Sequence, residues 1–310
     1  TGSTGSTGAG GADTSQAFVY DVFVNNQSTE TGTPTGSIGL PFTTIQSAID
    51  YALDAGSPAG DYNILIAGGN YTSEGSLSVF QTSSSQDINI TLTALSSVSI
   101  DALTWNYDTS TAPAAPKLSI RALTSPPLGM GQRAVAFVAT DTPAMGAFRV
   151  TGSINGRNTS FTTDTLHATL ELSNVYMIDG TSILFHTFTT NTLDFFFYNS
   201  QLATFSNPNS MYYFLARARN CRFPVTLLVN SYQLIEDCYI ESGMTVTESQ
   251  ATVYDLPVGI FNTKCIGTFQ STGTAATFTL DSYSNWWFGT GATATTSNGS
   301  TLPIADATAH

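Results

Sequence analysis

The sequence carries little charge. Asp, Glu, Lys and Arg make up 10% of the 310 residues, well below the ~25% typical of soluble domains. Nine basic residues stand against 22 acidic ones, which gives a net charge of −13. Binding to a nucleic-acid backbone requires clustered cationic side chains, so the composition argues against nucleic acid as a partner.

Cysteine and histidine are also scarce. An odd total of three cysteines is not a disulfide framework, and we expect the thiols to be reduced and buried; they are Cys221, Cys238 and Cys265. The three histidines are too scattered for a metal site or a catalytic triad; they are His167, His186 and His310. The sequence therefore predicts no metal, no cofactor and assembly without disulfides.

Long hydrophobic runs are missing as well. No apolar run approaches the 18 residues or so that a transmembrane helix needs, so we expect no membrane insertion. Hydrophobic residues still make up 41% of the chain, and Ser and Thr together contribute 82 of the 310 residues. This composition predicts a folded core and a surface coated with hydroxyl groups rather than with charges.

Glycine recurs at every third position at the start of the chain, at Gly2, Gly5, Gly8 and Gly11. A collagen triple helix requires this period, because only glycine fits at its crowded axis. Four such triplets without proline also suit a flexible Gly/Ser linker. Residues 1–12 are therefore either the end of a collagen-like stalk, which would make the rest a trimeric head, or a linker.

A short amphipathic helix is expected after Pro41. Apolar residues there follow helical spacing over about three turns; they are Ile45, Ala48, Ile49, Ala52 and Leu53. Thr43 or Thr44 can cap the start of this helix, and Gly56 can end it. A strand is expected next, from Tyr62 to Ala67.

The order of these segments resembles the entry of pectate-lyase-like right-handed β-helices. The residues that carry the resemblance are an extended segment, a G-x-P-F-x-T-I-Q-x-A-I-D helix at 39–50, a strand, and G-G-x-Y at 68–71. The resemblance implies an all-β fold, a right-handed parallel β-helix (solenoid) whose open N-terminal end is covered by a short capping helix. Enzymes and viral fibre or tailspike heads share this entry, so it leaves the chemistry open.

An internal repeat supports a solenoid independently. Five segments share the pattern apolar, any, Asn or Asp, small, any, apolar; they begin at Leu172, Phe197, Ala218, Ile235 and Ile260, and a weaker sixth begins at Leu280. Stacked turns of a solenoid need equivalent apolar positions, because one turn cannot bury its own face. The Asn or Asp at the bend can adopt a left-handed backbone conformation and hydrogen-bond along the stack.

The aligned repeats also predict which side chains face outward together. One column is Glu171, Phe196, Arg217 and Leu234, and the next is Ser173, Tyr198, Arg219 and Glu236. Strand alternation places Phe195 and Phe197 in the core. Arg219 and Glu236 are expected one turn apart, ~4.8 Å along the stack, as an ion pair.

The candidate binding residues are Phe196, Tyr198, Arg217, Arg219 and Glu236. They suit either a sugar-binding groove or a surface ion pair beside aromatics that contact another subunit, and the second interpretation is favoured. Glycosidases need two carboxylates about 5 to 9.5 Å apart, and no pattern places two of Glu171, Asp179 and Asp194 on one face. Lyases with the resembling fold also gather acidic residues for Ca²⁺, and no D-x-D cluster occurs here. Catalytic residues therefore stay unassigned.

These observations favour a structural or adhesive surface protein, the head of a homotrimeric viral fibre or spike that attaches to a host glycan or receptor or to other virion proteins. Its place would be the virion surface, or the outside of a cell. The alternative is a polysaccharide depolymerase, a lyase or glycosidase, on the same fold. The predicted divisions are the stalk end or linker (1–12), the entry strand and capping helix (13–56), the β-helix (57–290) and a C-terminal tail (291–310).

Overall fold

The computed structural model describes most of the chain between residues 19 and 296. The described ranges are 19–81, 88–107, 117–123, 148–158, 167–177, 181–186, 192–202, 204–206, 216–223, 227–229, 233–240, 244–248, 258–261, 264–265, 269–273, 280–281, 287–288 and 294–296. The Gly-x-y segment at 1–12 lies outside them. Within these ranges the fold is all-β with a single α-helix, so the predicted fold class is confirmed at that level.

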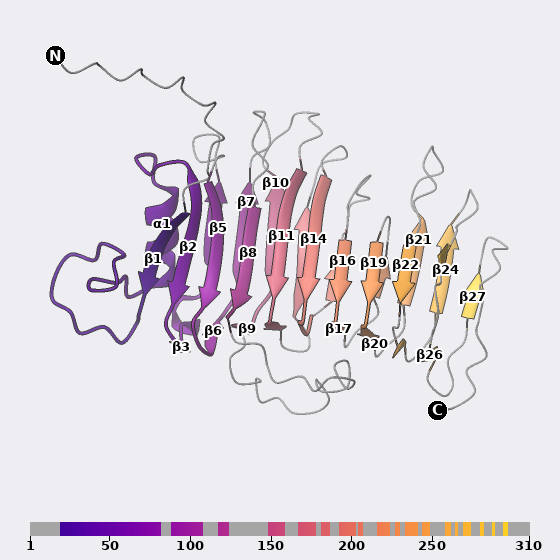
Figure 1. Cartoon of the computed structure of the whole chain (residues 1–310). Helices are drawn as coiled ribbons and strands as arrows, with labels where there is room; N and C mark the ends of the chain where they lie inside the picture. The colour runs from indigo at the N-terminus through magenta and orange to yellow at the C-terminus, as the bar shows by residue number, and fades with distance from the viewer. Residues whose placement is uncertain are drawn as a thin grey trace, which may run out of the picture.

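Ten strands form one long parallel sheet, which runs the length of Figure 1. In spatial order they are β1 (Val19–Val24), β2 (Gly60–Ile66), β5 (Ile88–Ala94), β8 (Lys117–Ala122), β11 (His167–Ser173), β14 (Thr192–Tyr198), β16 (Ala216–Arg219), β19 (Gln233–Glu236), β22 (Val258–Phe261) and β25 (Leu280–Asp281). Spatial order follows chain order, so each strand pairs with the equivalent strands of the turns before and after it.

Four smaller parallel sheets hold the remaining strands. Two follow the corner after the long sheet: β3 (Gly69–Asn70), β6 (Val98–Ile100), β9 (Phe148–Val150) and β12 (Val175–Met177), then β17 (Arg222–Phe223), β20 (Tyr239–Ile240), β23 (Lys264–Cys265) and β26 (Trp287–Phe288). Two lie on the third side: β4 (Leu77–Gln81), β7 (Leu103–Tyr107), β10 (Ile154–Asn158), β13 (Ser182–His186) and β15 (Thr204–Ser206), then β18 (Leu227–Val229), β21 (Met244–Glu248), β24 (Phe269–Gly273) and β27 (Ala294–Thr296).

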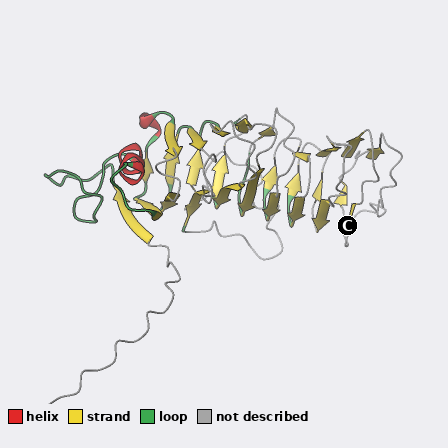
Figure 2. Ribbon diagram, turned by 90° about the horizontal axis from the view of Figure 1, so that it is seen from above, coloured by secondary structure: helices red, strands yellow, loops and turns green. Residues whose placement is uncertain are grey.

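Successive strands therefore visit the three sides of the stack in rotation. The chain passes from β2 in the long sheet to β3 and β4 in the other two and returns to the long sheet as β5. We call one such circuit a rung. This arrangement is consistent with a β-helix-like solenoid, and Figure 2 shows the strands of the different sheets stacked along one axis. β27 continues the stack into the segment predicted as a tail by pairing with β24.

The helix lies at the N-terminal end of this stack, as predicted. α1 (Ile45–Leu53) begins after Thr44, whose hydroxyl accepts a hydrogen bond from the Ser47 amide. Its apolar face is buried, and the helix packs against β1, β2, β4 and β5. Glu74, from the 3-10 turn η1 (Thr72–Glu74), accepts hydrogen bonds from the Ile45 and Gln46 amides at 3.0 Å each. A carboxylate at this position satisfies free amides and complements the helix dipole.

The register of the later rungs agrees with the internal repeat. Leu172 pairs with Phe197, Phe197 with Ala218, Ala218 with Ile235, and Ile235 with Ile260. The weaker sixth segment was aligned incorrectly: Leu280 pairs with Val258 instead of Ile260. An error of two residues preserves the alternation of faces, since side chains repeat every second residue in a strand, and hydrophobic pattern alone cannot detect it.

Candidate binding site

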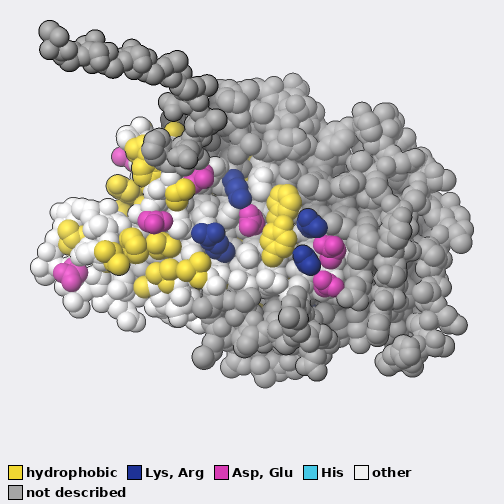
Figure 3. Space-filling view, viewed as in Figure 1, with side chains coloured by type: hydrophobic (Ala, Val, Ile, Leu, Met, Phe, Trp, Pro, Cys, Tyr) yellow, Lys and Arg dark blue, Asp and Glu magenta, His cyan; other side chains and the backbone are white. Residues whose placement is uncertain are grey.

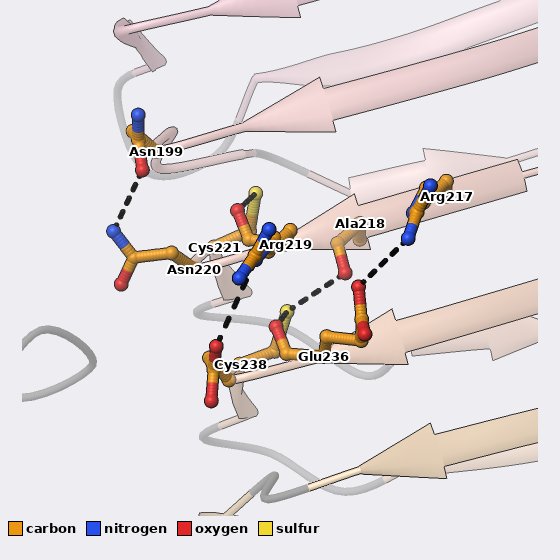
Figure 4. A network of polar contacts seen from close by, with 9 residues as sticks. Asn199, Arg217, Ala218, Arg219, Asn220, Cys221, Glu236 and Cys238 are labelled. Atoms are coloured by element: carbon orange, nitrogen blue, oxygen red, sulfur yellow. Dashed lines mark hydrogen bonds and ion pairs between the residues drawn. The ribbon is translucent and has the colours of Figure 1, made fainter.

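The Asn and Asp residues of the repeat lie at the corners where strands of the long sheet end. Asn174, Asn199, Asn220 and Asp237 have φ angles of 58°, 48°, 54° and 52°, in the left-handed region that Asn and Asp tolerate better than other non-glycine residues. The Asn220 side-chain amide donates to Asn199 Oδ1 at 2.8 Å, as Figure 4 shows. The predicted left-handed corner is therefore confirmed at these four rungs, and the predicted hydrogen bond along the stack is confirmed between Asn220 and Asn199. The fifth corner, Asn262, lies outside the described residues.

The outer face of the long sheet brings the candidate residues together. Phe196 pairs in register with Glu171 on one side and Arg217 on the other, and Tyr198 pairs with Ser173 and Arg219. Both predicted columns are therefore confirmed across β11, β14 and β16. Figure 3 shows this face, where apolar side chains lie between acidic and basic ones.

The aromatic run on β14 divides between core and surface as alternation predicts. Phe195 and Phe197 are buried and their ring centroids lie 5.7 Å apart. Phe196 and Tyr198 are partly buried on the outer face. Burial raises the pKa of the Tyr198 hydroxyl, and the neighbouring Arg217 opposes that shift. Tyr198 therefore presents an uncharged ring and hydroxyl beside a cation at neutral pH.

The predicted ion pair between Arg219 and Glu236 is wrong, because each residue contacts a different partner. The two residues are in register, but Glu236 Oε2 lies 3.2 Å from Arg217 Nη2, on the diagonal. Arg219 Nε instead lies 3.9 Å from Asp237 Oδ2, on the corner residue after β19. Long side chains reach diagonal neighbours as readily as direct ones, so register alone does not determine which charges meet. Figure 4 shows both contacts.

Two more cations lie on the same face, on β8. Lys117 Nζ contacts Glu171 Oε2 at 2.8 Å. Arg121 pairs in register with Ser173, so it belongs to the column of Tyr198 and Arg219. Sequence reasoning missed both residues because the repeat was traced only from β11 onward. A signal was available: Thr93-Ala-Leu-Ser-Ser and Arg121-Ala-Leu-Thr-Ser repeat the same pattern.

Glu171 and Glu236 are too far apart to act as a glycosidase pair. Glu171 and Glu236 lie on strands separated by two others, three strand spacings or about 14 Å apart, beyond the ~9.5 Å that an inverting pair spans. Each also contacts a cation. Asp194 pairs in register with Thr169, two residues before Glu171, so strand alternation puts the positions of Asp194 and Glu171 on one face, and the expectation that no two of these acids share a face is wrong. For Asp194 only the backbone is described, and Asp179 lies outside the described residues.

The described ranges hold neither a cluster of metal-binding side chains nor a membrane-spanning helix. No three His, Cys, Asp or Glu residues there gather closely enough to hold a metal ion. No helix in the same ranges is long and apolar enough to cross a membrane. His167 and His186 lie on β11 and β13, on strands of different sheets, and His310 lies outside the described residues.

Two of the thiols lie just inside the corners, as expected. Cys221 and Cys238 are buried and unbridged, and each follows a left-handed residue. The Cys238 thiol contacts the carbonyl oxygens of Glu236 and Ala218 at 3.1 and 3.5 Å (Figure 4). Burial raises the pKa of Cys238 well above its ordinary value, and Cys221 contributes to the shift. For Cys265 only the backbone is described.

Comparison with protein-family models, with curated proteins and with solved structures finds no match for this chain.

Proposed function

We propose that this chain is the right-handed β-helical head of a trimeric surface fibre or spike, and that it adheres to a glycan through the outer face of its long sheet. Parallel strands joined by crossovers are right-handed in about 98% of cases, which supports the handedness. The resemblance of residues 18–71 to the entry of viral fibre and tailspike heads supports a virion surface, and the Gly-x-y run at 1–12 supports a trimer.

The observation that carries the adhesive role is the outward aromatic pair. Phe196 and Tyr198 are two positions apart on β14, so both rings project from the same face. Sugar rings present apolar C–H faces, and aromatic side chains with a polar edge bind such faces well. Arg217 and Arg219 lie beside the pair and supply hydrogen-bond donors for sugar hydroxyls.

The geometry favours adhesion over cleavage. A depolymerase lowers a glycosidic barrier with paired ionisable groups that donate and accept protons. On this face Glu171, Glu236 and Asp237 each contact a cation. Asp21 and Asp61 each accept a hydrogen bond from an asparagine amide. We therefore expect glycan binding with no reducing ends released and no unsaturated product formed.

A glycan-binding assay with two matched variants tests the proposal. Phe196→Ala and Tyr198→Ala should weaken glycan binding by roughly tenfold each, because each removes about 1–2 kcal/mol of ring contact. Phe80→Ala and Tyr51→Ala remove aromatic rings that are more exposed, from β4 and α1, and should leave binding unchanged. Equal binding by all four variants would remove the aromatic pair from recognition.

Light scattering on the same samples tests the assembly. A trimer has three times the 32.8 kDa of the chain, about 98 kDa, and a monomer at micromolar concentration would contradict the fibre head. If Phe196→Ala and Tyr198→Ala dissociate the trimer and leave glycan binding intact, the aromatic pair is a subunit contact. Glycan cleavage by the wild-type protein would favour the depolymerase.

A further inference from the structure

The few cations of this acidic chain concentrate on one face. Four of its nine Lys and Arg residues belong to the outer face of the long sheet: Lys117, Arg121, Arg217 and Arg219. They lie on β8 and β16, with β11 and the aromatic strand β14 between them. The chain as a whole has a net charge of −13, and the carboxylates of Glu171, Glu236 and Asp237 lie beside three of these cations, so the face offers an anionic partner a single cation rather than a field of positive charge.

Arg121 differs from the other three cations in its contacts. Lys117, Arg217 and Arg219 each contact a carboxylate. Arg121 is exposed, and among the described residues no carboxylate lies within 4.0 Å of it; its Nε donates to Thr93 Oγ1 at 3.0 Å. Its charge is therefore available to a ligand.

A chain of hydrogen bonds orients this guanidinium. Thr93 accepts from Arg121 and donates to Asn63 Oδ1 at 2.6 Å, and the Asn63 amide donates to Asp21 Oδ1 at 3.0 Å. Thr93 is fully buried, so the acceptor that receives Arg121 Nε is held in place. With Nε engaged, the two terminal nitrogens form a planar fork that matches the two oxygens of a carboxylate.

The distance between Arg121 and the aromatic pair is about the length of one or two sugar residues. Arg121, Ser173, Tyr198 and Arg219 occupy consecutive strands in register, so two strand spacings, about 10 Å, separate the backbones of Arg121 and Tyr198. Ser173, between them, has a short side chain and leaves the space above it to a ligand.

We propose that this row binds a carboxylated glycan, with a sugar ring on Tyr198 and the carboxylate of the same or the next sugar held by Arg121. The inference rests on the proposed glycan adhesion and names its ligand class. A densely charged polyanion suits the site less well, because the chain as a whole repels it and three of the four cations are already paired. A sparsely charged glycan gains the local contact with less of that repulsion.

Binding of three glycan classes to the full chain tests this assignment. Neutral oligosaccharides, the same backbones carrying one carboxylated sugar, and a heavily sulfated polymer are compared for wild type, Arg121→Gln and Thr93→Val. Arg222→Gln on β17 is the matched control, since it makes the same change of net charge, from −13 to −14, on another sheet. Circular dichroism and a thermal melt establish that each variant is folded.

We expect wild type to prefer the carboxylated glycan and Arg121→Gln to lose that preference by tenfold to a hundredfold, roughly the loss of one charged hydrogen-bonded contact. Thr93→Val should reduce the preference by less, because it keeps the charge of Arg121 and removes only the hydrogen bond that orients its guanidinium. Arg222→Gln should keep the preference, and neutral binding should change less than twofold in every variant.

Three results would overturn the inference. Equal wild-type binding of neutral and carboxylated glycans would do so while leaving the proposed adhesion intact. Preferential binding of the sulfated polymer, weakened equally by Arg121→Gln and Arg222→Gln, would show a response to net charge alone. Binding of no glycan at all would reject the proposed adhesion, and the inference with it.

Discussion

The chain leaves the long sheet by one kind of corner in its early rungs and by another in its later rungs. After β5, the three residues Leu95, Ser96 and Ser97 lead to β6. After β11, Asn174 alone separates Ser173 from Val175 of β12, and it does so with a positive φ. Both corners join the same two sides of the stack.

The first residue after the strand donates its backbone N–H to a neighbouring rung at each corner. Leu95 N–H donates back to Ile66 O, on the preceding rung, at 2.9 Å. Asn174 N–H donates forward to Tyr198 O, on the following rung, at 3.0 Å. The two donors are not equivalent positions. Ser173 pairs with Arg121, and Arg121 pairs with Thr93, so Asn174 corresponds to Ala94 and Leu95 lies one residue further on. Successive N–H groups of a parallel strand point to opposite neighbouring strands, so the difference that remains between the corners is the positive φ of Asn174.

The two corners also depend on small or special residues for different physical reasons. A Cβ atom added at Gly68 would lie 2.9 Å from Ser96 Cβ on the next rung, so the early corner requires space. The later corner requires a residue that tolerates positive φ, and its Asn side chain can also bond along the stack. One architecture therefore places two distinct local demands on its sequence.

Breaking the later corner should give the largest effect. Asn220→Ala places alanine, which disfavours the left-handed region, at a φ of 54°. It also removes the hydrogen bond from the Asn220 side chain to Asn199 Oδ1. We expect a loss of about 3 kcal/mol in the free energy of unfolding, from ~1–2 for the backbone and ~1–2 for the bond, measured by urea titration. Asn220→Gly should cost about 1 kcal/mol less, because glycine tolerates this backbone. Equal losses for Ala and Gly would contradict the role of the backbone angle.

Filling the early corner should cost somewhat less, about 2 kcal/mol. Gly68→Ala creates the contact with Ser96 Cβ, and the urea midpoint should fall. Combining it with Ser96→Gly removes that Cβ and should restore part of the lost stability, whereas Ser96→Ala keeps the Cβ and should restore none. Equal behaviour of the two double variants would show that space at Gly68 does not limit the corner.

Alkaline pH should lower the free energy of unfolding by a smaller amount, through one buried group in the early rungs and one in the later rungs. Burial raises the pKa of Cys238 at a later corner and of Tyr107 in the early rungs. A raised pKa means that the folded state keeps its proton while the unfolded chain loses it, so stability is complete below the unfolded pKa and falls above it.

The two groups should act in different pH ranges. The loss should begin near pH 8.5 for the Cys238 thiol and near pH 10 for the Tyr107 hydroxyl, at up to about 1.4 kcal/mol per pH unit for each group. In urea titrations from pH 7 to 11, Cys238→Ala should abolish the first decline and Tyr107→Phe should reduce the second. Burial also raises the pKa values of Tyr62, Tyr71 and Tyr198, so part of the second decline should remain. A first decline that persists in Cys238→Ala would assign it to another group.

The smallest effect is expected at the ion pairs of the later rungs. A double-mutant cycle of Arg217→Ala and Glu236→Ala should give a coupling of about 0–1 kcal/mol, since both side chains are partly exposed. The same cycle for Arg219 and Glu236, which are in register without contact, should give a coupling near zero. A larger coupling for the second pair would contradict the diagonal geometry.

The register of the later rungs could be predicted because one chemical motif marks every corner. Leu172, Phe197, Ala218 and Ile235 each precede an Asn or Asp by two residues, and that spacing turned out to be the pairing register. The early corners use sequences such as Ala94-Leu-Ser-Ser. Short runs of this kind do not stand out in a Ser/Thr-rich chain. Their repeat was therefore missed, and Arg121 with it.

Local sequence thus determined what depends on a residue and its near neighbours: the capped helix at Ile45, the left-handed corners, and the alternation that buries Phe195 and Phe197. The tertiary structure alone decided which charges meet and which remain available. Glu236 reaches diagonally to Arg217, and Arg121 is held by Thr93 from the preceding rung. Such contacts depend on how flexible side chains from separate rungs fill the space between strands, and sequence spacing does not specify that choice.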